Sequence, residues 1–118
     1  MARNACSNWQ KSLLLSFALA VAAGSSAGAA QNGSSLYAQK CAECHGQTGK
    51  GDGPSGKILM PSPRPFSTAL KGKSAVWIET VITQGGPAAG LSPEMPPNPS
   101  LSGNQVKDLI QYITGFRS

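Results

Sequence analysis

Two cysteines and the only histidine of the chain fall within five residues, in the sequence Cys41-Ala42-Glu43-Cys44-His45. A disulfide between cysteines three positions apart would close a very small loop, which stabilises a fold little. The spacing therefore needs a chemical reason. The pattern C-x-x-C-H is the signature of c-type haem attachment. Two thiols on one helical turn can add to the two vinyl groups on one edge of a haem, and the next residue is then carried over the iron. The motif predicts covalent haem c, with one iron, on Cys41 and Cys44 and with His45 as the proximal ligand.

Two other uses of such a cluster fit the chain less well. A structural zinc site requires four ligands, and the chain after residue 30 offers only two cysteines and one histidine. A thioredoxin-like redox pair requires a βαβ context, and no run of strands is visible in the sequence.

The first thirty residues have the three-part pattern of a secretory signal. Arg3 and Lys11 give a positive start, residues 13–23 are apolar and uncharged, and small residues follow. This is the arrangement of a signal peptide. The alternative, a membrane anchor, requires about 20 apolar residues, and Gly24, Ser25 and Ser26 interrupt the run too early.

We therefore expect residues 1–30 to be a Sec-type signal peptide, cleaved near Ala29 or Ala30. Residues 31–118 would then form a single domain in the periplasm, without a membrane span. Cleavage would also remove the odd cysteine, Cys6, and leave the pair in the motif. The remaining chain carries eight basic and five acidic residues, a net charge of +3 against +5 for the whole sequence. Because no run of basic residues exists, nucleic-acid binding is not expected, and a mildly positive surface suits an acidic protein partner.

Apolar spacing predicts three helices, over Gly33–Glu43, Ser74–Gln84 and Ser102–Gly115. Ser34 or Ser35 is expected to cap the first helix, and Gly85 to end the second. In the third, Ser102 and Gln105 have the spacing of a capping box, and Gly115 stands where a C-cap is expected.

The segments between these helices are rich in glycine and proline. Five glycines within Gly46–Gly56 indicate a loop. Three prolines within Ile58–Phe66 predict an extended segment, and Gly86–Pro99 reads as a further loop. So little regular structure makes a poor core for a domain of this size. A covalent haem would supply a large apolar plate around which helices and loops pack.

The chain resembles the class I monohaem c-type cytochromes of bacteria. The resemblance covers about residues 33–116 and rests on the haem motif, on Met95-Pro96 in a late loop, and on a closing helix with an aromatic at Tyr112. It implies an all-α, small cytochrome c fold, with three or so short helices and long loops wrapped around one haem. It also implies that the first and last helices cross near Gly33, Tyr37 and Tyr112. In the family, a Gly-Pro about a dozen residues after the haem histidine steadies the imidazole, whereas here Gly53-Pro54 follows after nine.

Met95 is the expected sixth ligand of the iron. With one histidine in the chain, bis-histidine ligation within a molecule is excluded. Two methionines remain after residue 30, and the prolines around Met95 can present its thioether at a fixed place. Met60, followed by Pro61, is the alternative ligand, and its other interpretation is packing beside the haem edge. The order of motifs in the family favours Met95.

A His/Met pair fills both axial positions and raises the reduction potential. We therefore expect a one-electron carrier, not an enzyme, that works as a monomer between a redox protein donor and acceptor. The alternative is a haem c subunit or dedicated partner of a larger periplasmic dehydrogenase or oxidoreductase complex. A haem enzyme or gas sensor lacks support, since no second histidine or acid–base pair accompanies the motif. Trp77 could carry electrons, but such a tryptophan more often packs in the core.

Overall fold

The computed structural model describes residues 32–117, and these residues contain helices but no strand. The expected signal peptide and its cleavage site lie outside the described residues. None of the described helices is long and apolar enough to cross a membrane. The prediction of a small all-α fold is confirmed.

The predicted first helix is divided in two. Helix α1 spans Gly33–Lys40 and helix α2 spans Ala42–His45. Cys41 lies between them with φ of −121° and ψ of −38°, outside helical geometry. The N-cap prediction was wrong: Asn32 caps α1, and its Oδ1 accepts hydrogen bonds from the Ser35 N–H at 2.9 Å and the Ser34 hydroxyl at 2.8 Å.

Helix α5, Gly103–Thr114, begins with the predicted capping box. The Ser102 hydroxyl accepts from the Gln105 N–H at 3.3 Å, and the Gln105 side chain accepts from the Ser102 N–H at 2.9 Å. Its buried stripe is Val106, Leu109 and Ile113. Because these side chains recur on one face, α5 can pack against two neighbours at once, α1 and α4.

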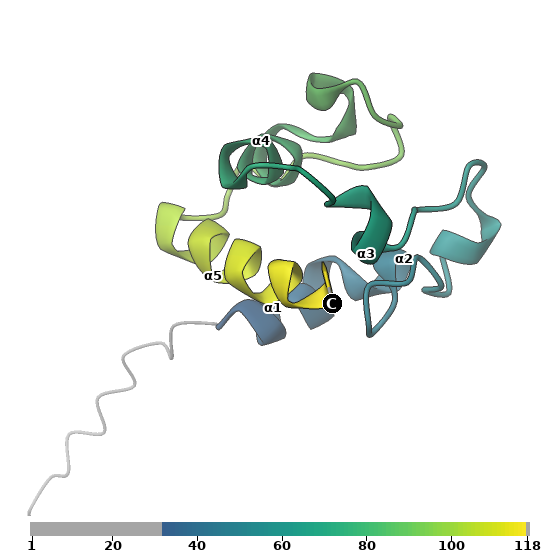
Figure 1. Ribbon diagram of the computed structural model, residues 1–118, viewed down its shortest axis with the longest axis horizontal. Helices are drawn as coiled ribbons and strands as arrows, with labels where there is room; N and C mark the ends of the chain where they lie inside the picture. The colour runs from purple at the N-terminus through teal and green to yellow at the C-terminus, as the bar shows by residue number, and fades with distance from the viewer. Residues whose placement is uncertain (1–31, 118) are drawn as a thin grey trace, which may run out of the picture.

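Helices α1 and α5 pack against each other (Figure 1), and Gly33 of α1 lies against Asp108 and Tyr112 of α5. A Cβ on Gly33 would collide with the carbonyl of Asp108 and with the Cβ of Tyr112. A glycine is therefore needed for the two backbones to approach. Tyr37 and Tyr112 meet at the same crossing, with ring centroids 5.3 Å apart. The crossing implied by the family resemblance is confirmed.

Helix α4, Ala75–Gln84, has both predicted ends. The Ser74 hydroxyl accepts from the Trp77 N–H at 3.1 Å, and Gly85 ends the helix with φ of 87°. Trp77 is half-buried against the core, and the Lys73 Nζ lies 4.6 Å from its ring centroid. The packing role expected for this tryptophan is confirmed.

The segments rich in glycine and proline contain short helices that the sequence did not predict. These are the 3₁₀ turns η1 (Gly56–Ile58) and η2 (Gly86–Ala89) and the one-turn helix α3 (Phe66–Ala69). Gly115 keeps right-handed helical geometry, with φ of −63°, so the chain continues into a 3₁₀ turn, η3 (Gly115–Arg117). That continuation was not expected, and it brings Phe116 back towards the core.

The core is small and strongly aromatic. Leu36, Tyr37 and Leu109 are fully buried. Around Tyr37 lie the rings of Phe66, Tyr112 and Phe116, with centroids 5.3 to 6.3 Å from its own. Segments distant in sequence, α1, α3 and the end of α5, are therefore joined at one place next to α2.

Candidate functional site

The three residues of the motif lie on one turn of chain. The Cys41 carbonyl accepts hydrogen bonds from the Cys44 N–H at 3.2 Å and the His45 N–H at 2.9 Å. Both cysteines are half-buried and carry free thiols. Because the helix is interrupted at Cys41, α2 begins anew at Ala42. The turn that carries the motif is therefore a separate element from α1, the helix that packs against α5.

The glycine-rich loop covers the carbonyl end of this turn. Gly51 donates to the His45 carbonyl at 2.8 Å, Gly53 to the Cys44 carbonyl at 3.3 Å, and Ser55 to the Glu43 carbonyl at 3.0 Å. The last carbonyls of a helix have no hydrogen-bond donor within the helix. Here the loop backbone supplies a donor to each of the three carbonyls, those of Glu43, Cys44 and His45.

Glycine is required in this loop because backbone meets backbone. A Cβ on Gly53 would collide with the carbonyls of Ala42 and Glu43, and one on Gly56 with the carbonyl of Cys44. The sequence predicted a loop from its composition. It gave no indication that the glycines fit against the cysteine turn.

Tyr37 joins helix α1 to the end of the turn. Its buried hydroxyl donates to the Gly46 carbonyl at 2.6 Å. Burial, helped by the nearby Cys41, Tyr112 and Asp52, raises the pKa of Tyr37 well above its ordinary value. The hydroxyl therefore stays protonated and remains a donor.

Burial favours the neutral forms of Cys41 and His45. Burial raises the pKa of the Cys41 thiol to about 11, with a smaller contribution from Cys44 and an opposing one from Lys40. Burial also lowers the pKa of His45. A neutral imidazole has a free lone pair on one nitrogen, which is the form that binds metals.

His45 is half-buried, and its imidazole has an unusual environment. Its Nδ1 is buried and has no hydrogen-bond partner among the described residues. The Phe66 ring stacks on the imidazole, with centroids 4.7 Å apart and planes 23° from parallel. The interaction by which a Gly-Pro steadies this ring in the family is therefore missing at Gly53-Pro54. The sequence did not indicate a role for Phe66 at the site, because its segment was predicted to be extended. The one available signal was an aromatic residue directly after three closely spaced prolines.

The two methionines differ in their surroundings. Met95 is half-buried, and its backbone is fixed by hydrogen bonds from its N–H to the Ser92 carbonyl at 3.2 Å and from the Gly86 N–H to its own carbonyl at 2.9 Å. The side chain of Met60 is 91% exposed. Met95 belongs to the segment between α4 and α5, which lies across the fold from α1 and α2 (Figure 1).

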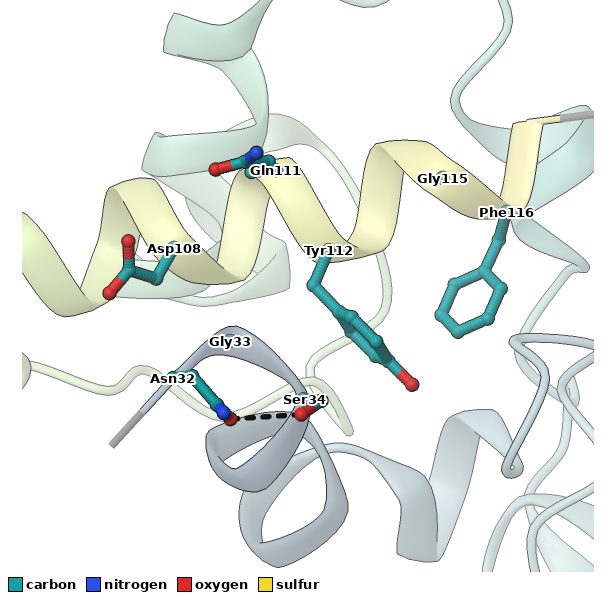
Figure 2. Close-up of a pocket in the computed structure, with 8 residues that line it drawn as sticks. All are labelled: Asn32, Gly33, Ser34, Asp108, Gln111, Tyr112, Gly115 and Phe116. Carbon is teal, nitrogen blue, oxygen red and sulfur yellow. Dashed lines mark hydrogen bonds between the residues drawn. The ribbon is translucent and has the colours of Figure 1, made fainter. Parts of the chain in front are cut away.

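A hollow on the described part of the protein lies apart from the four predicted site residues. It has a volume of about 650 Å³, opens to solvent, and lies beside the α1–α5 crossing, as Figure 2 shows. Its walls include Gly33 and Ser34 on α1, Tyr112 on α5 and Phe116 on η3. None of the four predicted site residues lines it.

Comparison with known proteins identifies the family. Residues 28–113 match the family model described as cytochrome c oxidase, cbb3-type, subunit III. The chain belongs to this family of c-type cytochromes. Among solved structures, the cytochrome is similar to the c-type cytochrome KustC0563, with 30% sequence identity, a TM-score of 0.56, and coverage of 74% of this chain and 99% of that one. No curated protein matches it significantly.

Membership of the family implies covalently bound haem c with its iron. The residues of the cytochrome fit that group. The turn offers two free thiols beside a neutral imidazole, and one of the imidazole nitrogens is buried without a partner. Two thiols and an imidazole on one turn are the groups that c-type haem attachment requires.

Proposed function

We propose that the cytochrome is a one-electron carrier in a periplasmic electron-transfer chain, with thioether links at Cys41 and Cys44 and with His45 and Met95 as axial ligands. The observation that carries the proposal is the turn on which two free thiols and a neutral, buried imidazole stand together. The bound haem iron supplies the chemistry, which is uptake and release of one electron.

In this proposal each part of the turn has a separate task. Cys41 and Cys44 fix the haem edge to the chain. The Nε2 of His45 would ligate the iron, and the imidazole proton would then be on Nδ1. The glycine-rich loop and the Tyr37 hydroxyl hold the backbone of the turn in place. The ligand geometry thus depends on rigid backbone contacts, which keeps structural change on electron transfer small.

Two contacts support Met95 as the second ligand. The Met95 carbonyl is tied to η2 through the Gly86 N–H, and Asn98 ties the segment to α4 by donating to the Ile82 carbonyl from both its N–H, at 3.0 Å, and its side chain, at 3.1 Å. A loop fixed on both sides of Met95 can hold a thioether in one place. Met60, largely exposed, lacks such support.

His/Met ligation would determine what the protein can do. Two protein ligands leave no open position on the iron for oxygen or peroxide, and a neutral thioether favours the reduced state. Electron transfer between a redox protein donor and acceptor is then the remaining activity, and no catalytic residue is assigned.

We also propose that residues 1–30 are removed as a signal peptide, that residues 31–118 form the mature domain in the periplasm, and that the protein is a monomer. A second candidate function is a haem c subunit or dedicated partner of a larger periplasmic oxidoreductase, favoured by the oxidase subunit in the description of the matched family. Native purification separates the two: a free carrier elutes alone, whereas a subunit co-elutes with other chains.

Paired methionine variants test the ligation. We expect Met95→Ala to remove the methionine-to-iron charge-transfer band of the oxidised protein, to lower the reduction potential and to let the reduced protein bind carbon monoxide. Met60→Ala, the matched control, should keep the wild-type spectrum. Loss of the band in Met60→Ala but not in Met95→Ala would assign the ligand to Met60.

A further inference from the structure

We propose that Phe66 is a positioning residue for the iron ligand, and that it orients the His45 imidazole by ring stacking in place of a hydrogen bond to Nδ1. This inference rests on the proposed function, in which His45 ligates the iron. It concerns a residue that lies 21 positions after the motif, at the first position of α3.

The stacking contact is close and nearly parallel. The imidazole and phenyl centroids are 4.7 Å apart, with planes 23° from parallel. Aromatic pairs at this separation attract one another beyond the effect of burial alone. A flat partner on one face of an imidazole restricts the rotation of that ring about its bond to the chain, and this rotation sets the ring's orientation over the haem.

The usual alternative, a hydrogen bond to Nδ1, is absent. A histidine that ligates a metal almost always donates its other ring N–H to a carboxylate, carbonyl or water. In this chain the Nδ1 is buried and makes no such bond among residues 32–117. The carbonyls of Gly53 and His45 accept from other donors, the Lys57 N–H at 3.0 Å and the Gly51 N–H at 2.8 Å.

Phe66 is itself held firmly enough to act as a support. Its N–H donates to the Gly49 carbonyl at 2.8 Å, and its ring is buried. The ring stacks on Phe116, 6.1 Å between centroids and 20° from parallel, and meets the edge of Tyr37 at 6.3 Å. A Cβ on Gly49 would collide with the Phe66 ring and crowd that of Phe116, so the backbone also fits tightly beneath them.

This arrangement has an electronic consequence as well as a geometric one. An acceptor on Nδ1–H makes the imidazole a more basic ligand, and a more basic ligand favours the oxidised iron. With Nδ1 buried and without an acceptor, the imidazole donates less charge, and the reduction potential is higher. Removing the Phe66 ring would free the imidazole to turn and would let water reach Nδ1.

The test replaces the ring in the haem-loaded protein. We expect Phe66→Leu to change the spread of g-values in the electron paramagnetic resonance spectrum of the oxidised protein, which reports the ligand plane, and to shift the midpoint potential downwards. Phe66→Tyr, which keeps the ring, should retain the wild-type values of both. The matched control is Phe116→Leu, which removes a ring of the same cluster that does not stack on His45.

Each outcome either supports or overturns the positioning role of Phe66. A shift in Phe66→Leu alone supports the positioning role. Wild-type values in Phe66→Leu, or equal shifts in Phe116→Leu, would overturn it, because the second result would mean general loosening of the core. If Phe66→Leu fails to accumulate as haem protein, Phe66→Met, which fills the space more adaptably, is judged by the same two measurements. If the spectrum of the unmutated protein itself shows no histidine ligation, the proposed function is refuted instead.

Discussion

The hydroxyl of Tyr37 should contribute measurably to the free energy of unfolding, because its hydrogen bond to the Gly46 carbonyl links α1 to the end of the cysteine turn. In Tyr37→Phe the Gly46 carbonyl loses the hydroxyl donor at 2.6 Å and keeps only the Gly49 N–H at 3.3 Å, while the ring remains in the core. Losing one intramolecular hydrogen bond costs about 0.5–1.5 kcal/mol. For a domain of this size each kcal/mol lowers the melting temperature by roughly 4–8 °C.

The assay is thermal unfolding of the haem-loaded protein at pH 7, followed by circular dichroism. Tyr112→Phe is the matched control, since half-buried Tyr112 belongs to the same ring cluster and its hydroxyl makes no hydrogen bond in the described part of the chain. We expect Tyr37→Phe to melt several degrees lower and Tyr112→Phe to melt near the wild type. Equal melting temperatures for Tyr37→Phe and the wild type would refute the reasoning.

The raised pKa of Tyr37 adds a dependence on pH that the same variant removes. The unfolded chain gives up the tyrosine proton above about pH 10, whereas burial holds that proton in the folded chain. The unfolded state therefore binds fewer protons above pH 10, and the free energy of unfolding falls as the pH rises further. In Tyr37→Phe this alkaline loss should be smaller than in the wild type.

Three further changes test the packing and the charge of the site. Leu109→Ala, at a fully buried position, should cost about 2–5 kcal/mol in a denaturant titration, whereas Lys107→Ala on the exposed face should cost little. Gly53→Ala should reduce the yield of haem-loaded protein, because its methyl group would collide with the carbonyls of the cysteine turn. A yield equal to that of the wild type would show that the loop backbone can shift to make room for the methyl group. Burial lowers the pKa of His45, so the unfolded chain takes up that proton first, and the free energy of unfolding should decrease as the pH falls below about 6.5; stability that is constant from pH 7 to pH 5 would contradict this.

Local signals predicted the helix ends best where one side chain determines them. The capping box of Ser102 and Gln105 is made by residues three apart, so the sequence holds all of its parts. The first helix shows the limit of this approach. Asn32, Ser34 and Ser35 are all good caps, and only the backbone conformation at Asn32 decides between them.

The tertiary contacts of the site left little trace in the sequence. The cysteine turn was evident from its spacing, but the partners of Gly53 and Gly56 are backbone carbonyls, which no residue type reveals. Phe66 begins a helix of one turn directly after Pro65, and the prolines before it concealed that helix. Gly115 was expected to end α5, yet its right-handed backbone carries the chain on to Phe116. The aromatic cluster next to His45 could therefore be found only from the fold.

The central claim is that Cys41 and Cys44 hold one haem covalently, and the intact mass of the denatured protein tests it most directly. After export and purification from cells able to mature c-type cytochromes, the account predicts the mass of the chain plus one haem, still present after extraction with acidified acetone. Cys44→Ala should weaken or abolish that retention. A denatured chain with the mass of its residues alone, and two thiols that react freely with an alkylating reagent, would contradict the account.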